Sequence, residues 1–165
     1  MPVMESSTIA MTGPLDPRES WVADRCPMAR TLEVISTKSA FLILREAFYG
    51  TTRFDDFAKR AQVSDPVAAA RLSELVEEGL LEREPYREPG QRTRHAYHLT
   101  EKGSDLLPVL VSMMQWGNRW LDERGGRVEL RHVGCGEPVR AELRCSSAHD
   151  VPADELELQV QTHNY

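Results

Sequence analysis

Apolar residues recur at helical spacing in four short stretches of the first half of the chain. These stretches cover residues 28–35, 41–48, 54–61 and 69–76. Apolar side chains that return every three or four positions are typical of the buried face of an amphipathic helix. Gly50 and Gly79 follow the second and fourth stretches, where glycine favours a helix C-terminus. The pattern predicts four helices, with a break between the first two near residues 36–37.

The third and fourth predicted helices are joined by a tight turn at residues 62–64. Ser64 or Asp65 fits the N-cap of the fourth helix, and Pro66 fits its first turn because proline is tolerated there. This arrangement is helix, turn, helix. Ahead of it, the first 15 residues show no apolar period and are expected to be a disordered arm. A short helix with Trp21 and Val22 is predicted to follow the arm.

The pattern changes to strands after Gly79. Residues 80–86 and 93–99 read as two strands around an arginine-rich loop that contains Pro89-Gly90, which predicts a hairpin. Thr100 then caps a long predicted helix over residues 101–124, which we expect to bend at Pro108.

Beyond Gly125-Gly126, three further strands are predicted, over residues 128–133, 139–144 and 156–160. They suggest a small β appendage. The predicted organisation is therefore a disordered arm (1–15), a central domain (16–124) and the β appendage (127–165). The fold class is α+β, mainly α.

The long predicted helix carries more apolar surface than a small domain can bury. Its apolar residues cover more than one stripe, so a partner surface is implied. We expect these side chains to form a dimer interface or to line an effector pocket. The residues concerned are Leu110, Met113, Met114, Trp116 and Trp120.

The overall charge argues against a nucleic-acid partner, because the chain has 20 basic and 26 acidic residues and a net charge of −6. The acidic excess, however, lies outside residues 26–99, which carry equal numbers of basic and acidic groups. Within that segment, arginines gather on the predicted hairpin. There is no apolar run long enough to cross a membrane and no export signal, so we expect a cytoplasmic protein.

A helix-turn-helix followed by an arginine-bearing hairpin suits DNA, because the second helix can enter the major groove while the hairpin reaches the neighbouring backbone. Residues 26–121 resemble the HxlR-type winged-helix transcriptional regulators, which are related to MarR-type regulators. The matching segments are CPMARTLEVI (26–35), LILRE (42–46), RFDDF (53–57), ARL (70–72), GLLER (79–83), YHLTEKG (97–103) and QWG (115–117). The resemblance implies a homodimer that binds double-stranded operator DNA.

The resemblance makes residues 64–75 the recognition helix and the hairpin the wing. The role of Arg71 is left open, because its side chain could read a base, contact a phosphate or pair with an acid such as Glu46 or Glu74. The expected DNA-binding residues are Arg53, Ser64, Asp65, Val67, Ala68, Arg71, Arg87, Gln91, Arg92, Arg94 and Lys102.

The sequence departs from the family at residues 36–39, where relatives have Gly-Gly-Lys-Trp. We expect Phe41, Phe48 or Trp116 to fill the space of the missing aromatic ring, or a cavity for a small molecule to remain. Cys26 stands where several relatives carry a redox-sensing cysteine. A thiol near a helix N-terminus is activated as a thiolate, so Cys26 is a candidate sensor, with simple packing as the alternative.

The tail holds a candidate metal site. Two short pairs, His132 with Cys135 and Cys145 with His149, have a spacing compatible with four tetrahedral zinc ligands. Ala148 occupies the place where longer relatives have the last cysteine. We therefore weigh a zinc site against a degenerate, metal-free zinc-ribbon-like fold.

The sequence predicts a dimeric transcriptional regulator that represses its genes until a small molecule or thiol oxidation releases it. No motif of an enzyme is found, no cofactor is required, and no membrane association is expected. The alternative is a protein-interaction module that recruits a transcription partner without sequence-specific DNA binding of its own.

Overall fold

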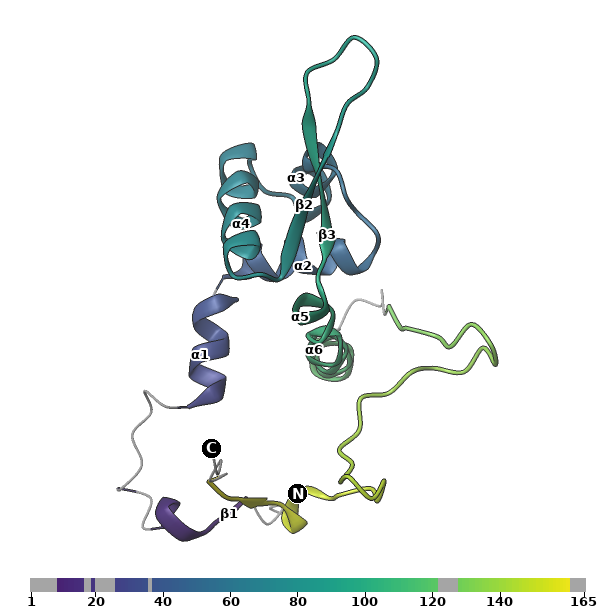
Figure 1. Ribbon diagram of the computed structural model, residues 1–165. Coiled ribbons are helices and arrows are strands. Elements are labelled where there is room, and N and C mark those ends of the chain that lie inside the picture. The colour runs from purple at the N-terminus through teal and green to yellow at the C-terminus, as the bar shows by residue number, and fades with distance from the viewer. Residues whose placement is uncertain (1–8, 17–18, 20–25, 36, 122–127, 161–165) are drawn as a thin grey trace. The chain divides into compact units, whose positions relative to one another are not determined.

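The computed structural model describes residues 9–16, 19, 26–35, 37–121 and 128–160 (Figure 1). They belong to two compact units: Arg30–Ala141, and Met1–Ala29 together with Glu142–Tyr165. The predicted helix with Trp21 and Val22 and the predicted domain boundary near residue 125 lie outside the described residues. Among those described, no helix is long and apolar enough to span a membrane.

The four predicted helices are confirmed. They are α1 (Pro27–Val34), α2 (Lys38–Phe48), α3 (Phe54–Ala61) and α4 (Asp65–Glu77). Thr37 begins α2 as its N-cap, because its hydroxyl accepts a hydrogen bond of 3.1 Å from the backbone amide of Ala40. In α3, acidic residues in the first turn and basic residues in the last turn both complement the helix dipole.

The core of the larger unit lies between α2, α3, α4 and the hairpin. Its largest fully buried side chains are Phe57, Ile43, Leu44, Leu72, Leu75 and Leu81. Phe41 and Phe48 pack against this cluster, whereas Trp116 is 58% exposed. Of the aromatic residues expected to compensate for the missing family tryptophan, only the two phenylalanines therefore face the core.

The predicted hairpin is formed by β2 (Leu81–Tyr86) and β3 (Arg94–Leu99), which pair antiparallel from Leu81 opposite Leu99 to Tyr86 opposite Arg94. Arg53 forms an isolated bridge to Ala96. The segment before α3 thus pairs with β3 at one residue and lies beside the hairpin. The hairpin loop extends past α3 and α4 (Figure 1).

A joint of four residues connects the end of α4 to the hairpin and the next helix. The Thr100 hydroxyl donates a hydrogen bond of 2.6 Å to the carbonyl of Gly79, and the Thr100 amide donates one of 3.1 Å to the carbonyl of Leu80. Gly103 lies so close that a Cβ atom there would be 2.1 Å from the Leu80 oxygen. Only glycine permits this approach.

The long helix predicted over residues 101–124 is instead two helices, α5 (Glu101–Ser104) and α6 (Leu107–Trp120). A turn at residues 105–106 separates the two helices. Pro108 therefore lies in the first turn of α6 and not at a bend within one long helix. Proline is well suited to that position because the first turn needs no amide donor. The predicted end of the helix at residues 122–124 lies outside the described residues.

Residues 128–141 form part of the larger unit because two amide side chains of α6 hold them. Gln115 donates a hydrogen bond of 2.7 Å to the carbonyl of Val139 and accepts one of 3.1 Å from the amide of Ala141. Asn118 donates one of 2.8 Å to the carbonyl of Val128. The prediction of strands at residues 128–133 and 139–144 is wrong. In the described part of this tail, each segment pairs with another at a single residue and forms an isolated bridge.

The smaller unit pairs the two ends of the chain. β1 (Ala10–Met11) and β4 (Glu157–Leu158) are parallel, and a short 3-10 helix lies close in sequence to each strand, at Gly13–Leu15 and Ala153–Glu155. β4 falls within the strand predicted at residues 156–160. The prediction of a disordered arm is corrected at residues 10–15, because the backbone of Ala10 and Thr12 finds hydrogen-bond partners in the tail.

Replacing Gly103 with alanine is expected to destabilise the larger unit by about 1–3 kcal/mol, because the added methyl group must displace the Leu80 carbonyl. Urea denaturation followed by circular dichroism measures the change. Gly117→Ala in α6 is the matched control, since nothing lies within 4 Å of a Cβ atom there. Equal stability of the Gly103→Ala variant and the wild type would show that the joint does not need this close approach.

Candidate nucleic-acid interface

The N-terminal half of α4 is exposed on the outer side of the helix-turn-helix. Gln62 adopts a left-handed conformation with φ of 54° at the end of α3, which turns the chain sharply. Ser64 and Asp65 are exposed, and Val67 is 38% exposed. Ala68 was predicted to reach DNA, but it is fully buried. This correction follows from the helix period, which turns Ala68 toward the core together with Leu72.

Arg71 pairs with an acid of its own helix. Its guanidinium forms an ion pair with the Glu74 carboxylate one turn later. Glu46, the other acid that could have paired with this arginine, is instead bonded to Arg45. An ion pair three residues apart on a helix surface is weak. Arg71 is therefore placed beside the exposed surface of α4, but its charge is already partly balanced.

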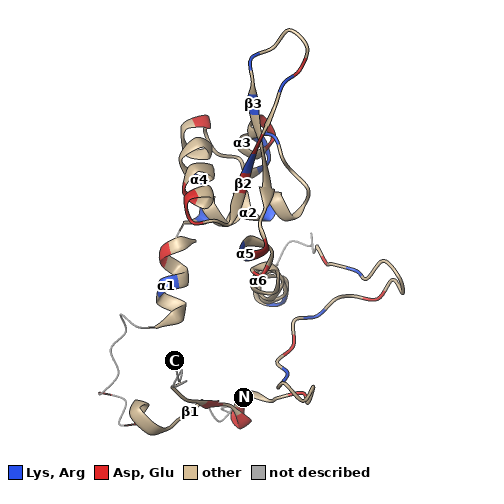
Figure 2. Ribbon diagram, in the orientation of Figure 1, with Lys and Arg blue, Asp and Glu red and all other residues tan. Residues whose placement is uncertain are grey.

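The hairpin carries basic residues along both arms and in its loop, interspersed with acids (Figure 2). The Arg87 side chain donates a hydrogen bond of 3.1 Å to the carbonyl of Gln91, which closes the loop. Arg92 is exposed. Arg94 forms an ion pair of 3.2 Å with Asp55 of α3, and both side chains are largely exposed. The guanidinium groups of Arg92 and Arg94 are therefore accessible to phosphates.

Arg53 lies beside the end of the β2–β3 strand pair that is next to the loop. Its guanidinium is stacked over the ring of Tyr86, 3.3 Å from the ring centroid, in a cation–π contact. The structure thereby brings Arg53 close to the strand pair of Tyr86 and Arg94, as the register requires. Tyr86 was not expected to have a role, although an aromatic residue at the end of an arginine-rich strand could have suggested one.

Lys102 lies at the other end of the recognition helix. Its amine donates a hydrogen bond to the carbonyl of Glu78, the C-cap of α4. A lysine at this place satisfies a free carbonyl and the negative end of the helix dipole. Lys102 is thus held at the C-terminal end of α4, and its DNA contact stays a prediction.

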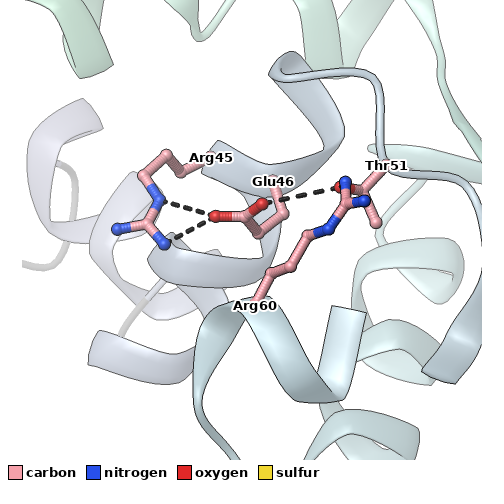
Figure 3. A network of polar contacts seen from close by, with 4 residues as sticks. All are labelled: Arg45, Glu46, Thr51 and Arg60. Atoms are coloured by element: carbon pink, nitrogen blue, oxygen red, sulfur yellow. Dashed lines mark hydrogen bonds and ion pairs between the residues drawn. The ribbon is translucent and has the colours of Figure 1, made fainter. Parts of the chain in front are cut away.

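A polar network supports α3 and thus the turn into α4 (Figure 3). Arg45 binds one carboxylate oxygen of the buried Glu46 through Nε and Nη2, at 3.0 and 2.6 Å. The Thr51 hydroxyl lies 3.5 Å from the other oxygen and accepts a hydrogen bond of 2.9 Å from Arg60 of α3. The network connects α2 to α3 through Thr51, so the buried charge of Glu46 is balanced.

One face of α6 carries exposed apolar side chains at a regular spacing. Val109, Met113, Trp116 and Trp120 follow one another at intervals of four, three and four residues and are 41%, 53%, 58% and 61% exposed. We call these four residues the α6 stripe. Leu110 points elsewhere and packs against the core, and Met114 is half-buried. Of the predicted interface residues, Met113, Trp116 and Trp120 thus share one face.

The three cysteines are free. Cys26 immediately precedes α1 and is 8% exposed. In the tail, His132 Nδ1 lies 3.2 Å from Cys135 Sγ, and the amide of Cys145 donates a hydrogen bond of 3.1 Å to the carbonyl of His149. Within residues 9–16, 19, 26–35, 37–121 and 128–160, no three His, Cys, Asp or Glu side chains are grouped to hold a metal ion. The His132–Cys135 pair lies in the larger unit and the Cys145–His149 pair in the smaller one, so zinc binding by these four residues stays a prediction.

Comparison with known proteins places this arrangement among transcriptional regulators. A family model described as HxlR-like helix-turn-helix matches residues 34–125. The chain is 41% identical over 120 residues to the uncharacterized HTH-type transcriptional regulator Rv3095 of Mycobacterium tuberculosis, across 72% of this chain and 75% of the relative. The crystal structure of PA1607, a proposed transcription factor, is similar with a TM-score of 0.73 at 34% identity, across 83% of this chain and 96% of that one. The redox regulator HypR in its oxidized form is similar with a TM-score of 0.52 at 28% identity, across 61% of this chain and 100% of that one.

Replacing Arg92 and Arg94 with alanine is expected to weaken DNA binding and to flatten its salt dependence. Each lost phosphate contact should reduce the slope of log K against log salt by about 0.9. Fluorescence anisotropy with labelled duplex DNA at several salt concentrations measures both effects for the single and double variants. Arg140→Ala removes an exposed charge from the tail and serves as the control for the single variants. Unchanged affinity at every salt concentration would reject the role of the two hairpin arginines.

Proposed function

The chain belongs to the HxlR-like helix-turn-helix family of transcriptional regulators, and from this premise we propose that it is a dimeric repressor that binds a specific operator. The α4 N-terminal half enters the major groove, and the hairpin contacts the adjacent backbone. The proposed activity needs no cofactor. We place it in the cytoplasm, where the operator DNA would be found.

The observation that carries this proposal is the juxtaposition of two exposed elements in one compact unit. The outer surface of α4 offers Val67, Ala69 and Ala70, whose methyl groups suit the methyl group of thymine, and Asp65, which can accept from a cytosine amine. The hairpin beside it extends past the helices (Figure 1) and carries the exposed side chains of Arg92 and Arg94. One element can therefore read bases while the other neutralises phosphates.

The net negative charge of the chain lowers the affinity for DNA that we expect. A net charge of −6 provides little general attraction to DNA. Affinity for random DNA should accordingly be low, and affinity for the operator should depend on the few hairpin arginines and on base contacts. Asp55 pairs with Arg94 and so lowers the positive charge of the hairpin. A DNA phosphate would have to replace Asp55 as the partner of Arg94.

Dimerisation is proposed through the α6 stripe. Apolar residues spaced four, three and four apart match the seam by which two helices pack against each other. Two tryptophans that are more than half exposed leave a large apolar area in water when the chain is alone. A second copy of the chain would cover it. Two recognition helices would then meet half-sites about one helical turn apart.

Release from DNA is proposed to follow binding of a small molecule or oxidation of a thiol. Cys26 is the candidate thiol, supported by the similarity to HypR, which is described as a redox regulator. It lies directly before the N-terminus of α1, and its low exposure means that an oxidant must first gain access. The α6 stripe and the half-buried Met114 remain candidates for lining an effector pocket.

A gel-shift titration with the DNA upstream of its own gene tests the DNA-binding proposal. We expect a discrete complex that survives competitor DNA at low salt and weakens as salt rises. Scrambled DNA of equal length and composition is the control. Equal retention of both DNAs, or of neither, would favour the alternative in which the protein recruits a transcription partner and does not itself select a sequence.

Replacing Trp116 and Trp120 with glutamate is expected to convert the dimer to a monomer. Loss of each buried ring should raise the dimer dissociation constant at least about tenfold. Size-exclusion chromatography with light scattering measures the mass over a range of protein concentrations. Trp116→Phe with Trp120→Phe retains apolar rings and should remain dimeric. A wild-type chain that is monomeric throughout, or a glutamate variant that stays dimeric, would contradict the proposed interface.

A further inference from the structure

The N-terminal half of α4 presents a small, apolar surface to solvent. Pro66, Val67, Ala69 and Ala70 are exposed, whereas Ala68 is fully buried. Val67 and Ala70 are three residues apart, so their side chains are neighbours on one face of the helix. The helix rise separates them by about 4.5 Å along its axis, and successive base pairs are about 3.4 Å apart. Methyl groups of the two residues can therefore reach adjacent base pairs when α4 lies in the major groove.

The side chains of α4 that can donate a hydrogen bond already have partners on the protein. Arg71 binds the Glu74 carboxylate, and its Nε is buried. The Ser73 hydroxyl donates a hydrogen bond of 3.0 Å to Glu77 and accepts one of 3.3 Å from Arg83. In α4, which is described from end to end, no other side chain can donate a hydrogen bond.

This distribution of polar groups disfavours guanine as the base that α4 reads. Guanine shows only the acceptors O6 and N7 in the major groove, so its recognition needs free donors. The Asp65 carboxylate only accepts, and the Ser64 hydroxyl, which makes no capping bond, can contact either kind of group and selects no base. The exposed methyl groups match instead the C5 methyl group that thymine carries in the major groove. The modified base 5-methylcytosine presents the same group at the same ring position.

We propose that α4 selects its operator through the C5 methyl groups of pyrimidine bases, with Val67 and Ala70 making the apolar contacts. This inference rests on the DNA-binding function proposed above, and it specifies the chemical group of DNA that the recognition helix reads. Thymine supplies this group in unmodified DNA, and 5-methylcytosine supplies it in methylated DNA. Burial of one methyl group corresponds to about a fourfold gain in affinity, so two contacts give more than about tenfold.

The test begins with selection, by the full-length protein, of duplexes from a random pool in which every cytosine is 5-methylcytosine. The enriched duplex is then prepared in four forms, with thymine or uracil and with 5-methylcytosine or cytosine. Uracil differs from thymine only by the missing C5 methyl group, so the hydrogen-bonding edges of the bases are the same in all four forms. Fluorescence anisotropy at one salt concentration measures the dissociation constant of each form.

We expect the form without C5 methyl groups to bind at least about tenfold more weakly than the selected form. The two intermediate forms show whether thymine or 5-methylcytosine supplies the contacted methyl groups. Equal affinity of all four forms would overturn the methyl readout and leave the proposed function standing, because the protein would still have selected a sequence. Enrichment of no duplex would contradict the proposed function itself, and the methyl readout with it.

A variant of α4 tests which side chain makes the contact. Val67→Ala removes two exposed methyl groups and should lower the ratio of affinities for the fully methylated and unmethylated forms at least about threefold. Val139→Ala is the matched control, since it makes the same change outside α4 at a side chain that is 41% exposed, against 38% for Val67. The ratio compares two DNAs with one protein, so a general loss of folded protein does not alter it. An unchanged ratio in Val67→Ala would overturn the assignment of the contact to Val67.

Discussion

The close approach of Gly103 to the carbonyl of Leu80 is the constraint on which the arrangement of the larger unit depends. It allows Thr100 to reach the end of α4, where its hydroxyl and amide bind the two carbonyls of Gly79 and Leu80. The same few residues end the recognition helix, begin β2, complete β3 and cap α5. The helix that would read bases, the hairpin that would contact the backbone and the helices that lead to the apolar stripe are therefore fixed to one another at a single place.

This fixed geometry explains how an acidic chain can be suited to DNA. The joint and the Glu46 network hold α4 and the hairpin in place from two sides. Because the two elements are fixed to one another, DNA binding does not have to order them first.

Helical spacing and turn chemistry were sufficient to predict α1 to α4 and the hairpin. These four helices and two strands have strong periodic patterns, and residues such as Pro66, Gly79 and Thr100 mark their ends clearly. The sequence could not indicate the break between α5 and α6, because apolar residues continue across it. It also failed for residues 128–141, whose alternating pattern resembles strands although Gln115 and Asn118 bind the backbone there.

Side-chain roles were harder to predict than elements. Ala68 lies one residue from an exposed position, so a small rotation of α4 decides whether it faces the core or solvent. Lys102 was assigned by its charge, whereas the free carbonyl of Glu78 determines its contact. Arg53 was expected near a helix start, but its stacking on Tyr86 depends on the register of Arg53 with Ala96, which only the folded chain defines.

The proposed DNA-binding surface combines α4 and the hairpin. Hydrogen exchange measured by mass spectrometry, with and without operator DNA, tests it most directly because it locates the contact on the intact protein. We predict slower exchange in residues 62–71 and 86–95 together, with no change in residues 128–141. Protection of the tail alone, or of neither segment in a complex that demonstrably forms, would contradict a shared DNA-binding surface.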